Sequence, residues 1–117
     1  MRNYPLVLLT FAFYVPNNYS IRIFRHKQLD YSKHPCPIEI WGWKPYVIGA
    51  MNAHNNIVRK YSKKHPDILF VDQAKLNNGS GKFYHDPCHF TDEGSKLFVK
   101  NLVNVIIPTI KDYSYEN

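Results

Sequence analysis

An aspartate and a histidine stand three positions apart in the segment HDPCHFTDEG, as Asp86 and His89. At that spacing in a turn, the carboxylate can accept a hydrogen bond from the imidazole Nδ1–H and leave Nε2 free as a general base. The carboxylate would also stabilise the imidazolium ion that forms during a reaction. The pair is therefore a candidate for acid–base catalysis, and the alternative is a structural Asx-turn that holds an ordinary polar histidine.

A second chemistry, zinc binding, needs cysteine and histidine ligands that converge on one point. KHPCP contains His34 and Cys36, and HDPCH contains His85, Cys88 and His89, so two histidines and two cysteines could bind zinc. However, His-x-Cys and Cys-His are unusual spacings for chelating pairs, and the chain has no C-x-x-C motif. We therefore expect no metal or cofactor, and we expect the cysteines to pack as small apolar side chains.

The elements that must position these residues begin with two short apolar runs. PLVLLT (5–10) and DILFVD (67–72) are continuous runs, typical of strands covered on both faces in a parallel sheet. Between them, segment 44–64 has apolar residues at three- and four-residue steps, with His54 or Asn55 on the same face, which predicts a helix. Two strands make a poor independent sheet, so we also expect open strand edges and exposed apolar surface.

A last helix is predicted over residues 92–107, because Thr91 is a good N-cap and acidic residues follow it in the first turn. The alternation of strands and helices indicates an α/β fold. We expect a single domain, 1–117, that forms part of a three-layer α/β/α arrangement with a short parallel sheet. Loops at the carboxyl ends of parallel strands gather ligands. The Asp86–His89 segment follows the second strand, so we expect it at that edge.

The long loop 15–44 is rich in proline and is of the length that commonly carries function. Two tryptophans in its CPIEIWGW stretch, Trp41 and Trp43, could line an acyl pocket or could anchor the loop on the core. Both interpretations stay open at the level of the sequence.

The net charge of +6 raises the question of a nucleic-acid partner. Its one local cluster, RKYSKK (59–64), is typical of a solvated helix flank and has no recognition motif beside it, so no nucleic-acid partner is expected. The N-terminal run LVLLTFAFYV (6–15) lacks a small-x-small cleavage site and is too short to cross a bilayer. Neither a signal peptide nor a membrane span is expected, and the compartment is not defined.

The segment DPCHFTDEGSKLF resembles the last sequence block of the SGNH, or GDSL-type, serine hydrolases. The match consists of Asp86, His89, Phe90, Thr91 and Gly94, and the upstream elements follow that family's order, so the resemblance covers about residues 4–107. It implies a flavodoxin-like fold and hydrolysis of a small acyl ester by a serine nucleophile without a metal. It also implies that His89 is the catalytic base, that Asp86 orients it, that Thr91 caps the last helix, and that Gly94 lets this helix pack closely.

The family's Gly-Asp-Ser nucleophile block and its Gly and Asn oxyanion blocks have no counterpart in this chain. Ser80 in NNGSGK precedes the Asp–His pair, but it has no strand-to-helix elbow around it and is not expected to be a nucleophile. We therefore expect the C-terminal portion of such a hydrolase, inactive alone, whose serine comes from a missing N-terminal half in a longer or partner chain. The alternatives are a non-catalytic remnant or binding module with the same fold and, less favoured, a zinc-binding domain.

Overall fold

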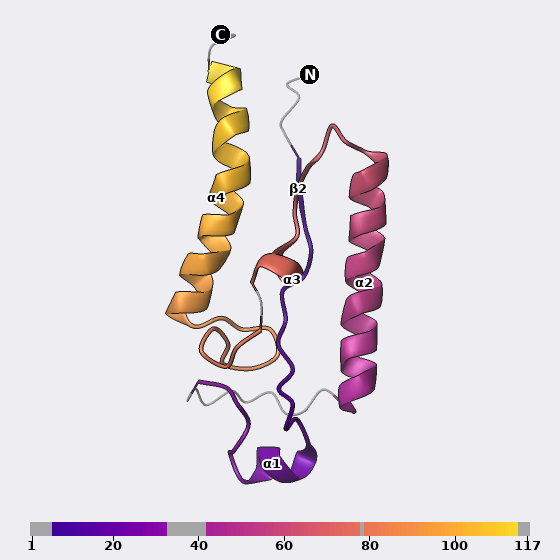
Figure 1. The fold of residues 1–117 in the computed structure, drawn as a ribbon, viewed down its shortest axis with the longest axis vertical. Helices are drawn as coiled ribbons and strands as arrows, with labels where there is room; N and C mark the ends of the chain where they lie inside the picture. Colours follow the sequence, from indigo (N-terminus) through magenta and orange to yellow (C-terminus); the bar gives the residue numbers. More distant parts are fainter. Residues whose placement is uncertain (1–5, 33–41, 78, 115–117) are drawn as a thin grey trace.

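The computed structural model describes residues 6–32, 42–77 and 79–114, with side chains described up to residue 109. The chain forms a strand, two helices, a second strand and two further helices in that order (Figure 1). Their bounds are β1 Val7–Leu9, α1 Ile21–Arg25, α2 Lys44–Lys64, β2 Leu69–Val71, α3 Gln73–Leu76 and α4 Asp92–Ser114.

The two strands pair in parallel, with Val7 opposite Leu69 and Leu9 opposite Val71. Each strand lies inside one of the two predicted apolar runs and is three residues long. The pairing extends just past β1, where the Thr10 N–H donates to the Val71 carbonyl at 3.2 Å. The predicted parallel sheet with a helix in its crossover is therefore confirmed.

The sheet lies between the two long helices, with α2 on one side and α4 on the other (Figure 1). Residues of α2 contact β1, and residues of α4 contact β2. This helix–sheet–helix order confirms the α/β class predicted from the alternation of strands and helices.

Helix α2 has the predicted bounds, Lys44–Lys64, with Pro45 in the first turn. Its inner face buries Val47 and Asn55. The prediction that His54 could occupy this face is wrong, because His54 is exposed and its neighbour Asn55 is fully buried. One residue corresponds to a rotation of about 100° around the helix axis, and the sequence period could not separate the two positions.

Two other predictions of local structure need correction. The segment expected to be a continuous loop, 15–44, contains α1, whose N-cap Ser20 accepts a hydrogen bond from the Ile23 N–H. Helix α4 continues to Ser114, beyond the predicted end at residue 107. It runs through Pro108, which removes one helical hydrogen bond but leaves the helix continuous.

Polar side chains tie the carboxyl ends of both strands to α2. The Arg59 guanidinium donates to both oxygens of Asp72, at 2.7 and 2.8 Å, and the Thr10 hydroxyl donates to the same carboxylate at 2.8 Å. Asn55 accepts from the Phe11 N–H at 2.7 Å and donates to the Phe11 carbonyl at 2.9 Å. The strand ends are thereby held beside α2, at the edge of the sheet where the Asp86–His89 segment was expected.

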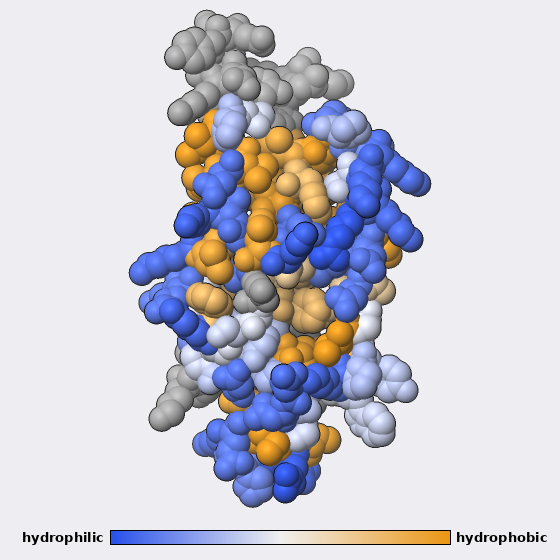
Figure 2. All heavy atoms as spheres, viewed as in Figure 1, coloured by the Kyte–Doolittle hydropathy of each residue, from blue (hydrophilic) through white to orange (hydrophobic). Residues whose placement is uncertain are grey.

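Apolar side chains remain exposed around this small sheet. Figure 2 shows an apolar area between the two long helices, over the strands. Leu6 is 56% exposed at the start of β1, Ile57 of α2 is 68% exposed, and α4 exposes Val99, Val103 and Ile107. Within the described ranges the sheet has only the two strands. The expected open strand edges and apolar surface are therefore present. No helix of the described part is long and apolar enough to span a bilayer.

Candidate active site

The segment that carries Asp86 and His89 is a closed loop between α3 and α4. Tyr84 and Phe90 form an antiparallel bridge at its base, and the His85 N–H donates to the His89 carbonyl at 2.8 Å. Tyr84 is fully buried, and its ring packs on Phe90 at a centroid distance of 5.1 Å. The loop therefore has a fixed base, from which the Asp86–His89 turn projects.

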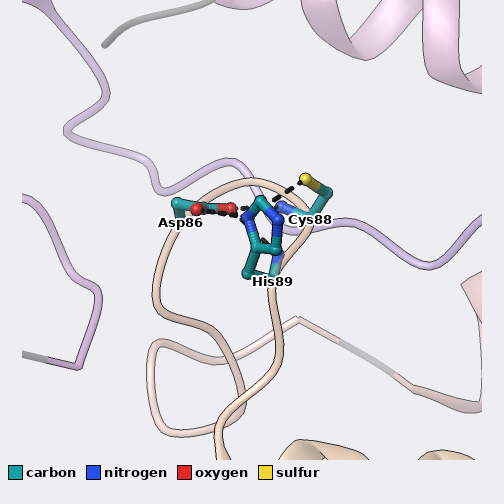
Figure 3. Close-up of side chains that lie close together, drawn as sticks. All are labelled: Asp86, Cys88 and His89. Carbon is teal, nitrogen blue, oxygen red and sulfur yellow. Dashed lines mark hydrogen bonds and ion pairs between the residues drawn. The ribbon is translucent and has the colours of Figure 1, made fainter. Parts of the chain in front are cut away.

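Asp86 and His89 contact each other directly (Figure 3). Oδ2 of Asp86 lies 2.6 Å from His89 Nδ1. The other oxygen, Oδ1, accepts the backbone N–H groups of Cys88 and His89, both at 2.9 Å. Residue Asp86 is 4% exposed to solvent, whereas the His89 side chain is 59% exposed. The aspartate is thus anchored in the turn, and the imidazole is largely exposed to solvent.

The hydrogen-bond pattern determines which imidazole nitrogen carries the proton. A carboxylate accepts only, so the nitrogen that faces Asp86 Oδ2 carries a hydrogen. In the neutral ring the lone pair is then on Nε2, which is the arrangement that a general base needs. The predicted contact is present, and its backbone anchors also make it an Asx-turn. The two interpretations of this spacing therefore describe one structure.

Residues from the segment after β1 support the turn from behind. The Tyr14 N–H donates to the Pro87 carbonyl at 3.0 Å, and the Tyr31 hydroxyl donates to the Tyr14 carbonyl at 2.7 Å. Burial, followed by the hydrogen bond to Asp30, raises the pKa of Tyr14 to about 12. Burial is also the main cause that raises the pKa of Tyr31. Both phenols therefore stay protonated at neutral pH.

His85 is held away from the Asp86–His89 contact. Its Nδ1 lies 2.5 Å from the Ser32 hydroxyl, which also donates to the Tyr84 carbonyl. The Ser32 N–H is bonded to the carbonyls of Gly81 and Tyr84. Sequence reasoning identified neither Ser32 nor the two tyrosines, because they contact the turn from more than 50 positions away and no local pattern reports such a contact.

The start of α4 agrees with the roles that the resemblance implies for Thr91 and Gly94. The Thr91 hydroxyl accepts the Gly94 N–H at 3.1 Å, so Thr91 is the N-cap. A Cβ atom at Gly94 would lie 2.2 Å from the Phe83 carbonyl oxygen. Only glycine fits there, and it allows the first turn of α4 to lie against the base of the loop.

The other predicted site residues do not join the pair. Trp43 is 74% exposed and its ring stacks on that of Tyr46, so in the described part of the chain it is not buried on the core. Trp41 lies outside the described residues. The Ser80 hydroxyl accepts the Lys82 N–H at 3.3 Å and caps a turn.

The zinc set proposed from the sequence is only partly testable, since His34 and Cys36 lie outside the described residues. In the described part, the ligand atoms that cluster are those of Asp86, Cys88 and His89, and His85 is not among them. Cys88 is half-buried and is not the fully buried side chain expected from the sequence. Its Sγ lies 3.6 Å from His89 Nδ1.

The arrangement can move protons but cannot by itself attack an acyl group. His89 can take a proton at Nε2, and Asp86 can stabilise the resulting imidazolium ion. A nucleophile and donors for an oxyanion would have to be placed on the solvent side of the ring. Comparisons with protein-family models, curated proteins and solved structures found no match to this chain.

Proposed function

We propose that this chain supplies the acid–base half of an SGNH-type serine ester hydrolase, with His89 as the general base and Asp86 as its orienting acid. One observation carries the proposal: the buried Asp86 carboxylate, anchored by two backbone N–H groups, lies 2.6 Å from Nδ1 of an imidazole whose side chain is 59% exposed. In the neutral ring this contact places the hydrogen on Nδ1 and leaves the lone pair on Nε2.

The surroundings of the pair support the same proposal. The turn lies after β2 and is held by Tyr14, which follows β1, so both strand ends contribute to its placement. Ligand sites of parallel α/β sheets are found at this edge. The N-cap Thr91 and the sterically required Gly94 place the last helix directly behind the pair.

The serine nucleophile and the oxyanion donors would come from a further polypeptide segment, either in a longer chain or in a partner. The open sheet edge and the exposed apolar side chains of Leu6, which precedes β1, and of α2 and α4 give such a segment a surface on which to pack. The substrate would be a small acyl ester, and its class is inferred from the resemblance.

The first test is the coding sequence upstream of Met1. A Gly-Asp-Ser segment within about 200 codons upstream supports the proposal, because that length is enough for the missing N-terminal part of one domain. Its product, expressed with this chain, should hydrolyse p-nitrophenyl acetate, and a fluorophosphonate probe should label its serine. Both signals should fall by at least about 100-fold in His89→Ala, because the general base is lost.

His85→Gln is the matched control, since His85 lies in the same loop but is bonded to Ser32. Its activity should remain within a few-fold of that of the unsubstituted protein. Activity that survives His89→Ala, or the absence of any serine segment upstream, would favour the alternative, a non-catalytic module that keeps the fold.

A further inference from the structure

Cys88 stands beside the Asp86–His89 pair, and the proposed hydrolysis does not use it. Its sulfur, the Asp86 carboxylate and an imidazole nitrogen of His89 all lie within 4.8 Å of one another. Figure 3 shows the sulfur and the carboxylate both directed at the His89 ring. Sulfur, nitrogen and carboxylate oxygen together are the ligand types that zinc and similar borderline-soft cations prefer.

One pair of these atoms, the thiol sulfur and an imidazole nitrogen, has the spacing found in a tetrahedral site. With zinc–sulfur near 2.3 Å and zinc–nitrogen near 2.0 Å, the two ligand atoms lie about 3.5 Å apart. The distance from Cys88 Sγ to His89 Nδ1 is 3.6 Å. The Asp86 Oδ2 to Nδ1 distance is a hydrogen-bond distance of 2.6 Å and would have to open to about 3.3 Å.

The carboxylate is already oriented for such a role. Its Oδ1 accepts hydrogen bonds from the backbone N–H groups of Cys88 and His89, and its Oδ2 faces the imidazole. Outer contacts of this kind orient metal ligands and raise affinity.

We propose that Asp86, Cys88 and His89 bind one borderline-soft divalent cation such as Zn²⁺, through Oδ2, Sγ and Nδ1. The Asp86 carboxylate and the Cys88 thiolate balance the two positive charges, and water takes the fourth position. The thiol releases one proton. The imidazole stays neutral, because the hydrogen on Nδ1 is lost to water and Nε2 takes one up.

The bound cation excludes general-base chemistry at His89, because Nε2 then carries a hydrogen and has no lone pair to offer. The site is therefore an inhibitory one, in which the cation competes with the Nδ1 proton. This consequence rests on the proposed hydrolase function, whereas the binding of the cation does not.

The test is a titration of the reduced 117-residue chain with Co²⁺ at neutral pH, followed by absorption. One equivalent should produce a thiolate-to-cobalt charge-transfer band in the near ultraviolet, and Zn²⁺ should displace it. Cys88→Ser should abolish the band. Asp86→Asn should weaken binding by about tenfold or more, because one anionic ligand is lost. Cys36→Ser and His85→Gln are the matched controls and should leave the band unchanged.

A second readout follows the imidazole of His89. In ¹⁵N spectra of the chain with Zn²⁺, the hydrogen should move from Nδ1 to Nε2. Absence of a thiolate band, a band retained in Cys88→Ser, or a band lost in Cys36→Ser would overturn the proposal. These readouts do not involve ester hydrolysis, so failure of the cation site and failure of the hydrolase proposal are distinguished.

Discussion

The Asp86 carboxylate divides its two oxygens between two tasks. Oδ1 accepts the N–H groups of Cys88 and His89, and Oδ2 lies 2.6 Å from His89 Nδ1. The first task forms the turn, and the second selects the tautomer of the imidazole. Because one buried side chain does both, a substitution that preserves the turn can still change the chemistry of His89.

Asp86→Asn is expected to invert the tautomer of His89. The amide oxygen can keep both backbone N–H groups, so the amide NH₂ then faces Nδ1 as a donor and the ring hydrogen moves to Nε2. Long-range ¹H–¹⁵N spectra of the imidazole would show this change. Asp92→Asn, an exposed carboxylate in the first turn of α4, is the control and should leave His89 unaltered. Retention of the Nδ1 hydrogen in Asp86→Asn would contradict the prediction.

Gly94→Ala should destabilise the fold by about 2 kcal/mol or more, because the new methyl group would overlap the backbone of Phe83. Gly49 of α2 is the matched control, since nothing lies within 4 Å of its Cβ position. Gly49→Ala should stabilise the chain by about 0.5–1 kcal/mol through helix propensity. Urea unfolding of the two variants measures both changes, and changes of the same sign would be inconsistent with the close contact at Gly94.

Asn55→Ala should cost about 2 kcal/mol of unfolding free energy. The buried amide makes two hydrogen bonds to Phe11, and its removal leaves an N–H and a carbonyl without these partners. His54→Ala, one position earlier on α2, should change stability by less than about 0.5 kcal/mol, because His54 is exposed. Thermal unfolding compares the two, and equal losses would show that Asn55 is not the residue that joins α2 to β1.

The Arg59–Asp72 pair should contribute to acid sensitivity. The hydrogen bond from Arg59, with a further contribution from Thr10, holds the pKa of Asp72 below its usual range. A carboxyl whose pKa is lower in the folded state stabilises the fold above its unfolded pKa, about 3.9, and this stability is lost as the pH falls toward the folded value. Unfolding free energies measured from about pH 6 down to pH 2 should therefore decrease less steeply in Asp72→Asn than in the unsubstituted chain.

Asp67→Asn is the control for that measurement, because Asp67 is an exposed carboxylate just before β2. This substitution should leave the decrease of the unfolding free energy at low pH unchanged. A slope that is the same in Asp72→Asn and in the unsubstituted chain would show that Asp72 does not gain from its partners on folding.

Local sequence patterns predicted the strands and the helix that are stabilised by residues within the same short segment. The runs around Val7–Leu9 and Leu69–Val71 are apolar throughout, which is typical of strands covered on both faces, and α2 is bounded by Pro45 and Pro66. The Asp86–His89 contact could also be predicted, since its partners are three positions apart and Asp86 itself forms the turn that joins them.

Contacts between distant segments were not predictable in this way. The choice between His54 and Asn55 depended on how α2 is rotated against β1, because only the residue that faces Phe11 can bond to it. The exposure of Trp43 depended on whether another segment covers it, and in the described residues its ring stacks on that of Tyr46 and stays 74% exposed. The predicted end of α4 at residue 107 was too early, since the helix continues through Pro108 to Ser114.

The sequence by itself determined the two strands, the helix between them and the Asp–His turn, because each depends on interactions within a few residues of the chain. The tertiary structure alone decided how firmly that turn is held. Tyr14, which lies more than 50 positions before Pro87 and is bonded to Tyr31, reaches the turn because the parallel pairing of β1 with β2 brings both strand ends to one edge. It also decided that the carboxylate is buried and the imidazole exposed, since burial is a property of the packed chain and not of residue spacing.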